Sequence, residues 1–150
     1  MSLNNVLDMF TFTFYIFSLL LSYFDCKRFI VPNVILATCF LLILFFGYFE
    51  DRLNIYSFIV SFLVLLFFIL IMMIKPKMIL GGGDIKYMML VAVYLNPLLF
   101  PLFLLTTGIV QTIFLVYKQY YKKRRVAPMV PAMFISVVVV ELLFTFGIYP

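Results

Sequence analysis

Two aspartates are the residues of this sequence best suited to chemistry. Asp25 stands in the segment DCKRFIVPN, and Asp84 stands far along the chain in GGGDIK. Two carboxyl groups that share one proton can hydrolyse a peptide bond, because the ionised group activates water while the protonated group polarises the carbonyl. Like charges close together titrate separately, so such a pair holds both forms at one pH. The sequence therefore predicts aspartic-peptidase chemistry, provided that the two carboxyl groups meet in space.

Composition removes most other hydrolytic designs. The chain contains no histidine, so it cannot form a Ser-His or Cys-His pair or an H-E-x-x-H zinc site. A Ser-Lys pair stays open by composition, but Ser22 and Lys27, as one example, show no distinctive arrangement. We expect the two cysteines, Cys26 and Cys39, to be small apolar filler without a disulfide or a metal.

The three glycines before Asp84 suggest how a substrate could reach that carboxyl group. Gly81, Gly82 and Gly83 have no side chain, can adopt positive φ and allow another backbone to approach closely. A helix start also favours an anionic side chain such as that of Asp84. A purely structural interpretation is equally simple, with glycines ending one helix and Asp84 capping the next. Lys86 points elsewhere on a regular helix and is a candidate for substrate contact or for surface charge.

Glu141 is a third acid within an apolar stretch. An ionisable residue inside a membrane span is a functional hypothesis by default. Its place in the outer half of the last span separates it from Asp25 and Asp84, and we expect a structural role in which it pairs with a helix neighbour. The remaining acids are expected at the solvated outer surface, where carboxylates are ordinary. They are Asp8, Glu50 and Asp51.

Membrane helices must position these acids. Hydrophobic residues make up 67% of the chain and charged residues 11%, with a mean hydropathy of +1.22, which is far from the soluble norm. We therefore expect an integral membrane protein of one domain, residues 1–150, since no polar stretch is long enough for a soluble module. The expected spans are 6–24, 34–49, 54–74, 85–95, 98–117 and 127–148.

The fourth span is too short to cross a bilayer. Its eleven residues cover only about 16 Å of a hydrocarbon core about 30 Å thick, and Asn96-Pro97 then interrupts the helix. We expect a hairpin at Asn96-Pro97, with Asp84 held below the membrane surface or in a cavity. The alternative of one helix over 85–117 would be about 50 Å long, which overshoots the bilayer.

Loop charges predict the orientation, because Lys and Arg of short loops stay on the cytoplasmic side. With six spans and the amino end outside, ten of the eleven basic residues fall inside, including the run KKRR at 122–125, and only Arg52 falls outside. The expected fold is thus an all-α polytopic membrane protein with six transmembrane helices, both termini outside, in the cytoplasmic membrane. The net charge of +5 needs no nucleic-acid partner, because a basic inner face beside anionic lipid explains it.

These motifs resemble the type IV prepilin peptidase family, the bacterial and archaeal aspartic proteases that remove leader peptides from prepilins and preflagellin-like precursors. DCKRFIVPN is similar to the family's aspartate followed by basic residues and Ile/Val-Pro-Asn, and GGGDIK fits its G-x-G-D followed by lysine. RRVAPMVPAMFIS resembles the proline-containing start of its last helix. The resemblance covers nearly the whole chain. It implies an all-helical membrane fold, catalysis by Asp25 and Asp84 near the cytoplasmic face, and no metal or organic cofactor.

The chain differs from many bacterial members of that family. It lacks their cytoplasmic insert with paired Cys-x-x-Cys motifs, which accompanies an N-methyltransferase activity. It therefore resembles the short, peptidase-only branch, and we expect no methyl transfer.

Two other classes stay open. A non-catalytic membrane subunit or a small transporter could use Asp25 and Asp84 to bind a proton or cation, and a through-going polar pathway would distinguish it. Glu141 is the only acid in the outer half of a span that could extend such a pathway. An intramembrane protease of the presenilin type shares G-x-G-D, but that class has a Tyr-Asp pair within a helix, whereas Phe24-Asp25 is expected at a helix end.

Overall fold

The computed structural model of the protein describes residues 8–74, 81–122 and 127–147. Within these residues the chain is all-helical. The helices are α1 (Met9–Arg28), α2 (Asn33–Phe49), α3 (Ile55–Ile74), α4 (Gly82–Tyr94), α5 (Phe100–Lys122) and α6 (Val130–Thr145). Each one lies within or overlaps one of the six predicted apolar spans, so the predicted all-α class and the order of the helices are confirmed.

The predicted hairpin between α4 and α5 is present. The α4 helix ends at Tyr94, and α5 begins only at Phe100. Asn96 organises the turn, because its side-chain oxygen accepts a hydrogen bond from the backbone N–H of Leu98 at 3.3 Å and its carbonyl accepts one from Leu99 at 2.9 Å. Pro97 has no N–H with which to continue a helix. The alternative of one continuous helix over 85–117 is therefore wrong.

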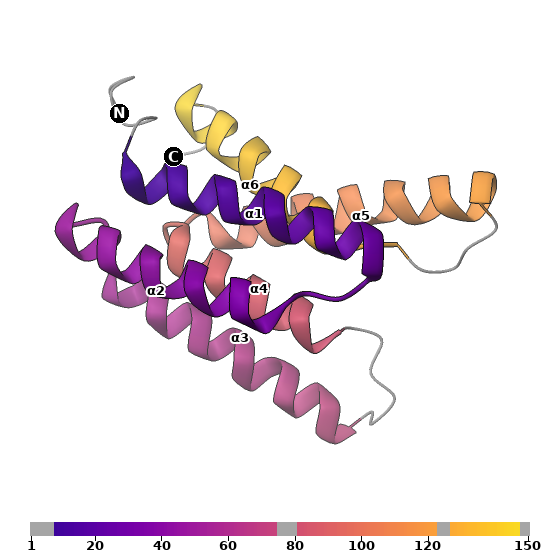
Figure 1. Ribbon diagram of the computed structural model, residues 1–150, viewed down its shortest axis with the longest axis horizontal. Helices are drawn as coiled ribbons and strands as arrows, with labels where there is room; N and C mark the ends of the chain where they lie inside the picture. Colours follow the sequence, from indigo (N-terminus) through magenta and orange to yellow (C-terminus); the bar gives the residue numbers. More distant parts are fainter. Residues whose placement is uncertain (1–7, 75–80, 123–126, 148–150) are drawn as a thin grey trace.

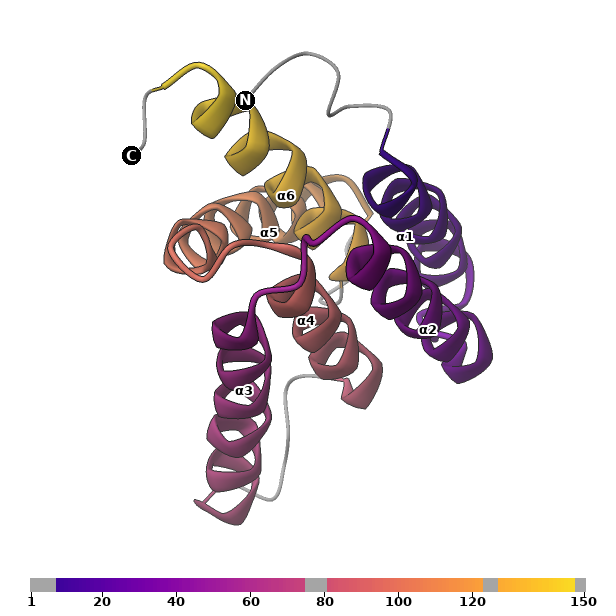
Figure 2. The ribbon, with the colours of Figure 1, turned by 90° about the vertical axis from the view of Figure 1, so that its left-hand side faces the viewer.

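The short α4 helix lies at the centre of the bundle. It packs against α2, α3 and α6, and Figure 2 shows these three helices around it. Its 13 residues are about 20 Å long, yet nearly all of its side chains after the first turn are buried. A helix that is apolar on all sides is typically enclosed by others. The protein around α4, rather than lipid, thus accommodates its short length.

Two further pairs of helices that are neighbours in the chain pack together. The α1 helix packs along α2 and α5 packs along α6, while α6 also packs against α1; the paired courses of α1 and α2 are visible in Figure 1. Because α6 packs against both α1 and α4, these three helices meet although they are distant in sequence. The same three helices carry the polar residues described below.

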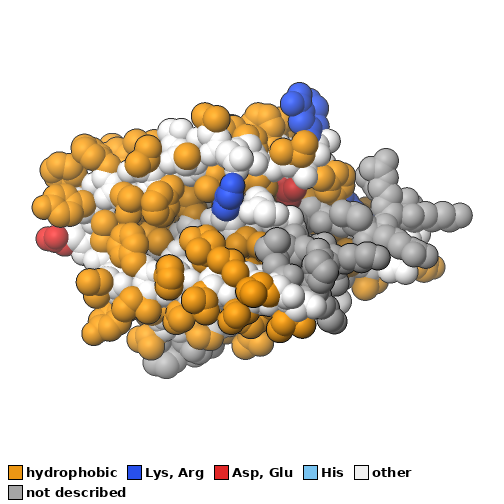
Figure 3. All heavy atoms as spheres, turned by 90° about the horizontal axis from the view of Figure 1, so that it is seen from below, with side chains coloured by type: hydrophobic (Ala, Val, Ile, Leu, Met, Phe, Trp, Pro, Cys, Tyr) orange, Lys and Arg blue, Asp and Glu red, His pale blue; other side chains and the backbone are white. Residues whose placement is uncertain are grey.

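The outward surface of the bundle is strongly apolar. Many large hydrophobic side chains are exposed on α1, α2, α3 and α5, and hydrophobic side chains dominate the face drawn in Figure 3. Among the described residues, Met9–Arg28 and Phe100–Tyr120 are long and apolar enough to cross a bilayer, and Asn33–Phe49, Ile55–Ile71 and Val130–Thr145 are shorter apolar helices. Six transmembrane spans with both termini outside stay a prediction.

Acidic side chains gather at the end of the bundle where α1 begins. Asp8 forms an ion pair with Arg52, and Glu50 accepts a hydrogen bond at 3.3 Å from the N–H of Phe10. Asp51 is exposed, as expected. Asp8 and Glu50 were expected to be simply solvated, but they tie the start of α1 to the turn after α2.

The basic residues described by the structure lie mainly at the opposite end of α1. Lys27 and Arg28 occupy its last turn, where the helix dipole favours cations. Residues 75–80 and 123–126 lie outside the described part of the chain. The charge prediction for the basic residues in those two segments, which include most of the KKRR run, is therefore untested.

Candidate active site

Asp25 lies in the last turn of α1. Its side chain is only 4% exposed and continues a buried stripe with Ser18, Leu21 and Ser22, whose spacing of three or four residues places them on one helix face. The helix continues to Arg28 and closes at Phe29, whose φ is 53° and whose N–H donates to the carbonyl of Asp25 at 2.9 Å. The prediction that Asp25 ends the helix was therefore one turn too early.

The start of α6 holds the Asp25 carboxylate. The backbone N–H of Val130, the first residue of α6, donates to Oδ2 of Asp25 at 3.0 Å. The first N–H groups of a helix have no partner within it and lie at the positive end of its dipole, so they favour the charged form of a carboxyl group. Pro131 suits the second helical position because its missing N–H is not needed there. Sequence reasoning missed this contact, although it did identify the proline-containing segment in which Val130 lies.

A lysine of α5 adds to the positive surroundings of Asp25. The ammonium group of Lys118 interacts favourably with the Asp25 carboxylate. It also lies 5.0 Å from the ring centre of Phe29, which is within the range of a cation-π contact. Sequence reasoning assigned Lys118 only to the basic inner face, and nothing in its local sequence indicated the electrostatic interaction with Asp25.

Asp84 occupies the first turn of α4, which begins at Gly82 with Gly81 as its N-cap residue. The backbone N–H of Asp84 donates to the carbonyl of Gly81 at 3.0 Å. The pKa of the Asp84 carboxyl group is raised from 3.8 to about 6, mainly by burial and also by the negative charge of Asp25, while a hydrogen bond with the Gly81 backbone opposes both. The structure thus brings the carboxyl groups of Asp25 and Asp84 within electrostatic reach at one end of the bundle.

The close approach of the two motif segments requires Gly83. A Cβ atom at this position would lie 2.7 Å from Cβ and 3.0 Å from Cγ2 of Val31. Val31 belongs to DCKRFIVPN, so the backbone of the glycine segment packs directly on the segment that follows Asp25. Only a residue without a side chain permits this distance.

The other two glycines lie in more open surroundings. A Cβ at Gly82 would meet nothing within 4 Å, and one at Gly81 would lie 3.0 Å from Oδ2 of Asp84. The freedom of these glycines to adopt positive φ is not used, because Gly81 has φ −69° and Gly82 and Gly83 are helical. The structure does not test whether Gly81, Gly82 and Gly83 bind substrate.

Lys86 makes a second link between the motifs. Its Nζ donates to Oδ1 of Asn33 at 2.9 Å. The α2 helix begins at Asn33, with Pro32 as its N-cap residue. Lys86 thus has a structural partner that sequence reasoning missed, and its contact with substrate stays a prediction.

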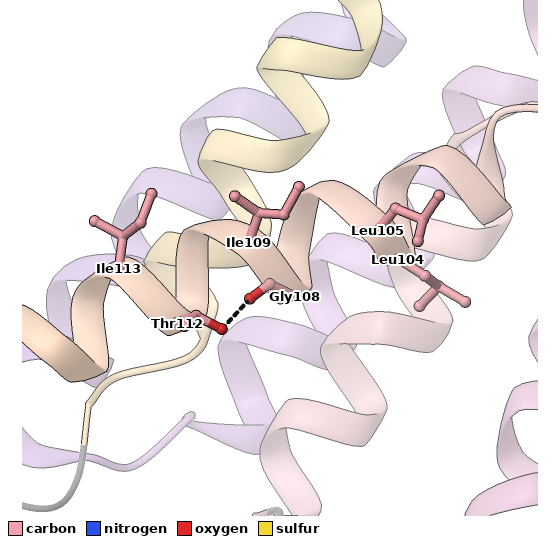
Figure 4. Close-up of a pocket in the computed structure, with 6 residues that line it drawn as sticks. All are labelled: Leu104, Leu105, Gly108, Ile109, Thr112 and Ile113. Atoms are coloured by element: carbon pink, nitrogen blue, oxygen red, sulfur yellow. Dashed lines mark hydrogen bonds between the residues drawn. The ribbon is translucent and has the colours of Figure 1, made fainter.

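The groove described by the structure away from the aspartates is lined almost entirely by apolar side chains. This shallow groove on α5, formed by Leu104, Leu105, Gly108, Ile109, Thr112 and Ile113, contains neither aspartate (Figure 4). Its one hydrogen bond is internal, from the hydroxyl of Thr112 to the carbonyl of Gly108 at 2.7 Å. Among the described residues, no group of three His, Cys, Asp or Glu side chains could hold a metal ion.

The structure is thus an all-helical apolar bundle with Asp25 and Asp84 within electrostatic reach of each other at one end. The chain matches the model of the Type IV leader peptidase family over residues 12–116. The matched stretch contains both Asp25 and Asp84, and the chain belongs to this family, which comprises leader-peptidase-type proteases acting on prepilin-like substrates. Comparison with curated proteins and with solved structures gave no match.

Proposed function

We propose that this protein is a membrane aspartic endopeptidase that cleaves the leader peptide from type IV prepilin-like precursors at the cytoplasmic face of the membrane. The observation that carries the proposal is that Gly83 packs on Val31, which brings the segments of Asp25 and Asp84 together so that the charge of Asp25 acts on the buried Asp84 carboxyl group. Family membership supports the peptidase class. The absence of N-methyltransferase activity belongs to the same proposal.

The two aspartates have different surroundings, and these assign their roles. Burial raises the pKa of Asp25 as well, but the N–H groups of Val130 and Met129 and the charge of Lys118 oppose that rise, so we assign Asp25 as the ionised member. Asp84 is the protonated member, because burial and the neighbouring charge of Asp25 oppose its ionisation. A pair of carboxyl groups with unlike surroundings is suited to separate acid and base roles.

Hydrolysis then proceeds in two balanced steps. Asp25 accepts a proton from water while the water oxygen attacks the scissile carbonyl carbon, and Asp84 donates a hydrogen bond to the carbonyl oxygen as negative charge develops on it. The tetrahedral intermediate collapses when the proton held by Asp25 passes to the leaving nitrogen. The products are the leader with a carboxyl terminus and the mature protein with a new amino terminus.

Recognition of the precursor rests on its apolar helix. The leader stays in the cytoplasm while this helix packs among the helices of the peptidase. Lys27, Arg28, Lys86 and Lys118 make the active-site end basic, and like charges would oppose a basic leader. The apolar helix of the precursor therefore supplies most of the affinity.

The proposal is tested with purified protein in lipid nanodiscs and a synthetic prepilin-like precursor. Mass spectrometry should find one cut at the boundary between leader and helix, without an added methyl group when a methyl donor is supplied. Proton or cation flux across protein-loaded vesicles, without any cleavage of precursors, would instead support the transporter class.

Cleavage should weaken as the pH rises through about 6. The pKa of Asp84 is raised to about 6, so its protonated, active form is present below that pH and declines about tenfold for each further pH unit. The profile of kcat/KM between pH 5 and 8 reports this group in the free enzyme. A flat profile over that range would contradict the role of Asp84 as the acid.

A further inference from the structure

Glu141 joins α6 to two other helices through tyrosine hydroxyls. The hydroxyl of Tyr15 in α1 donates to Oε2 of Glu141, and the hydroxyl of Tyr94 in α4 donates to Oε1 at 2.6 Å. The predicted pairing of Glu141 thus exists, and its partners lie on two other helices. Each carboxylate oxygen thus accepts one hydrogen bond from a different helix.

Aromatic packing fixes the two tyrosines. The ring of Tyr94 stacks on that of Phe14 with centroids 3.8 Å apart and an angle of 4°, and on Phe10 at 5.2 Å. Tyr15 meets Phe134 of α6 edge-on at 5.6 Å. The hydroxyl groups are therefore held in place, and the cluster joins α1, α4 and α6 firmly.

The same three helices build the candidate active site. Asp25 lies on α1, Asp84 on α4, and the N–H that holds Asp25 belongs to Val130 of α6. The helices therefore meet twice through polar groups, once at Glu141 and once at the aspartates.

The Glu141 cluster and the aspartate site are separated by nearly the same length along each of the three helices. Along α1, Tyr15 and Asp25 are ten positions apart; along α4, Asp84 and Tyr94 are also ten apart; along α6, Val130 and Glu141 are eleven apart. At about 1.5 Å per residue each separation is about 15 to 17 Å. Sliding any one helix along its axis would thus disturb the cluster and the site together.

We propose that Glu141 is a positioning residue, which fixes α1 and α4 against α6 through the two tyrosine hydroxyls and thereby keeps Asp25 and Asp84 within electrostatic reach of each other. The inference rests on the proposed peptidase function and deepens it. The hydrophobic effect contributes little to the association of apolar helices within lipid, so side-chain packing and interhelical hydrogen bonds determine how the helices are arranged. Hydrogen bonds to a charged acceptor are the stronger kind, and setting helix register is the best-attested use of a buried polar group.

The test compares Glu141→Leu and Glu141→Gln with wild type in nanodiscs. Leucine removes both acceptors, and we expect at least a tenfold loss of kcat/KM; glutamine keeps one oxygen acceptor and should lose less. Thr145→Ala is the matched control, since the Thr145 hydroxyl bonds only the backbone carbonyl of Glu141 at 2.8 Å and its removal should leave cleavage unchanged. Tyr94→Phe and Tyr15→Phe remove one donor each and should each give an intermediate loss.

The pH profile separates positioning from mere folding. The charge of Asp25 acts on Asp84, and the charge of Lys118 on α5 acts on Asp25, while Lys86 on the helix of Asp84 is hydrogen-bonded to Asn33. If Glu141→Leu lets Asp25 move away, the pKa of Asp84 falls, and the decline of activity begins at a lower pH than in wild type. Reduced folding alone would lower the amplitude of the profile without moving it.

A readout without substrate distinguishes failure of this inference from failure of the proposed function. Infrared titration follows the carboxyl band of Asp84, which is assigned by its loss in Asp84→Asn. The midpoint of this titration should lie at a lower pH in Glu141→Leu than in wild type. If Glu141→Leu does not fold, the same shift is expected in Tyr94→Phe. An unchanged midpoint in the folded variants overturns the positioning role, even if wild type cleaves precursor. A wild-type protein that cleaves no precursor overturns the peptidase function, while the infrared shift still decides the role of Glu141.

Discussion

Asp25→Asn and Asp84→Asn should each lower kcat/KM for precursor cleavage by at least about a hundredfold, the lower range of acid-base contributions. An amide can neither accept the proton of water at position 25 nor donate a carboxyl proton at position 84. The fold should persist in Asp25→Asn, because the oxygen of the new side-chain amide can still accept the Val130 N–H bond found at 3.0 Å. Cleavage is measured by mass spectrometry, and membrane insertion by extraction and size-exclusion chromatography.

Asp51→Asn is the matched control for this pair of substitutions. Asp51 is exposed in the turn after α2 with φ 50°, a conformation that asparagine tolerates as well as aspartate does. The Asp51→Asn substitution replaces the same carboxyl group by an amide far from the candidate active site, so cleavage at the wild-type rate is expected. Persistent cleavage in either active-site variant would reject the aspartate pair as the catalytic group.

Gly83→Ala should give the second large effect, on stability and on cleavage together. The added Cβ would lie 2.7 Å from Cβ of Val31, and such overpacking typically lowers the free energy of unfolding by about 1–3 kcal/mol. Relief of the clash moves α4 away from the segment that follows Asp25, so cleavage should fall as well. Thermal unfolding in detergent and the cleavage rate in nanodiscs measure the two effects.

Gly82→Ala provides the comparison one residue away. A Cβ there meets nothing within 4 Å, and replacing a helical glycine by alanine typically stabilises by about 0.4–1 kcal/mol. Equal unfolding temperatures for the two alanine variants would mean that the contact between Gly83 and Val31 is unimportant. A loss of cleavage in the stable Gly82→Ala protein would instead support the predicted substrate contact of the glycine segment.

The helices were predictable because their causes are local. Long apolar runs predict helices in a membrane-like chain, and Asn96-Pro97 breaks the pattern at the turn between α4 and α5, where the structure places it. The glycine segment shows the limit of this reasoning. Freedom to adopt positive φ is only a capacity of glycine, and α4 begins at Gly82 with ordinary helical geometry.

Local sequence by itself thus determined the all-helical class, the order of the helices and the two aspartates worth testing. Only the tertiary structure decided which groups surround them: the Val130 N–H at Asp25, Val31 against Gly83, and Glu141 between two tyrosines. The physical reason is that hydrophobic spacing reports which face of a helix is buried. It does not report which distant helix covers that face or at what axial position, because packing between whole helices sets both.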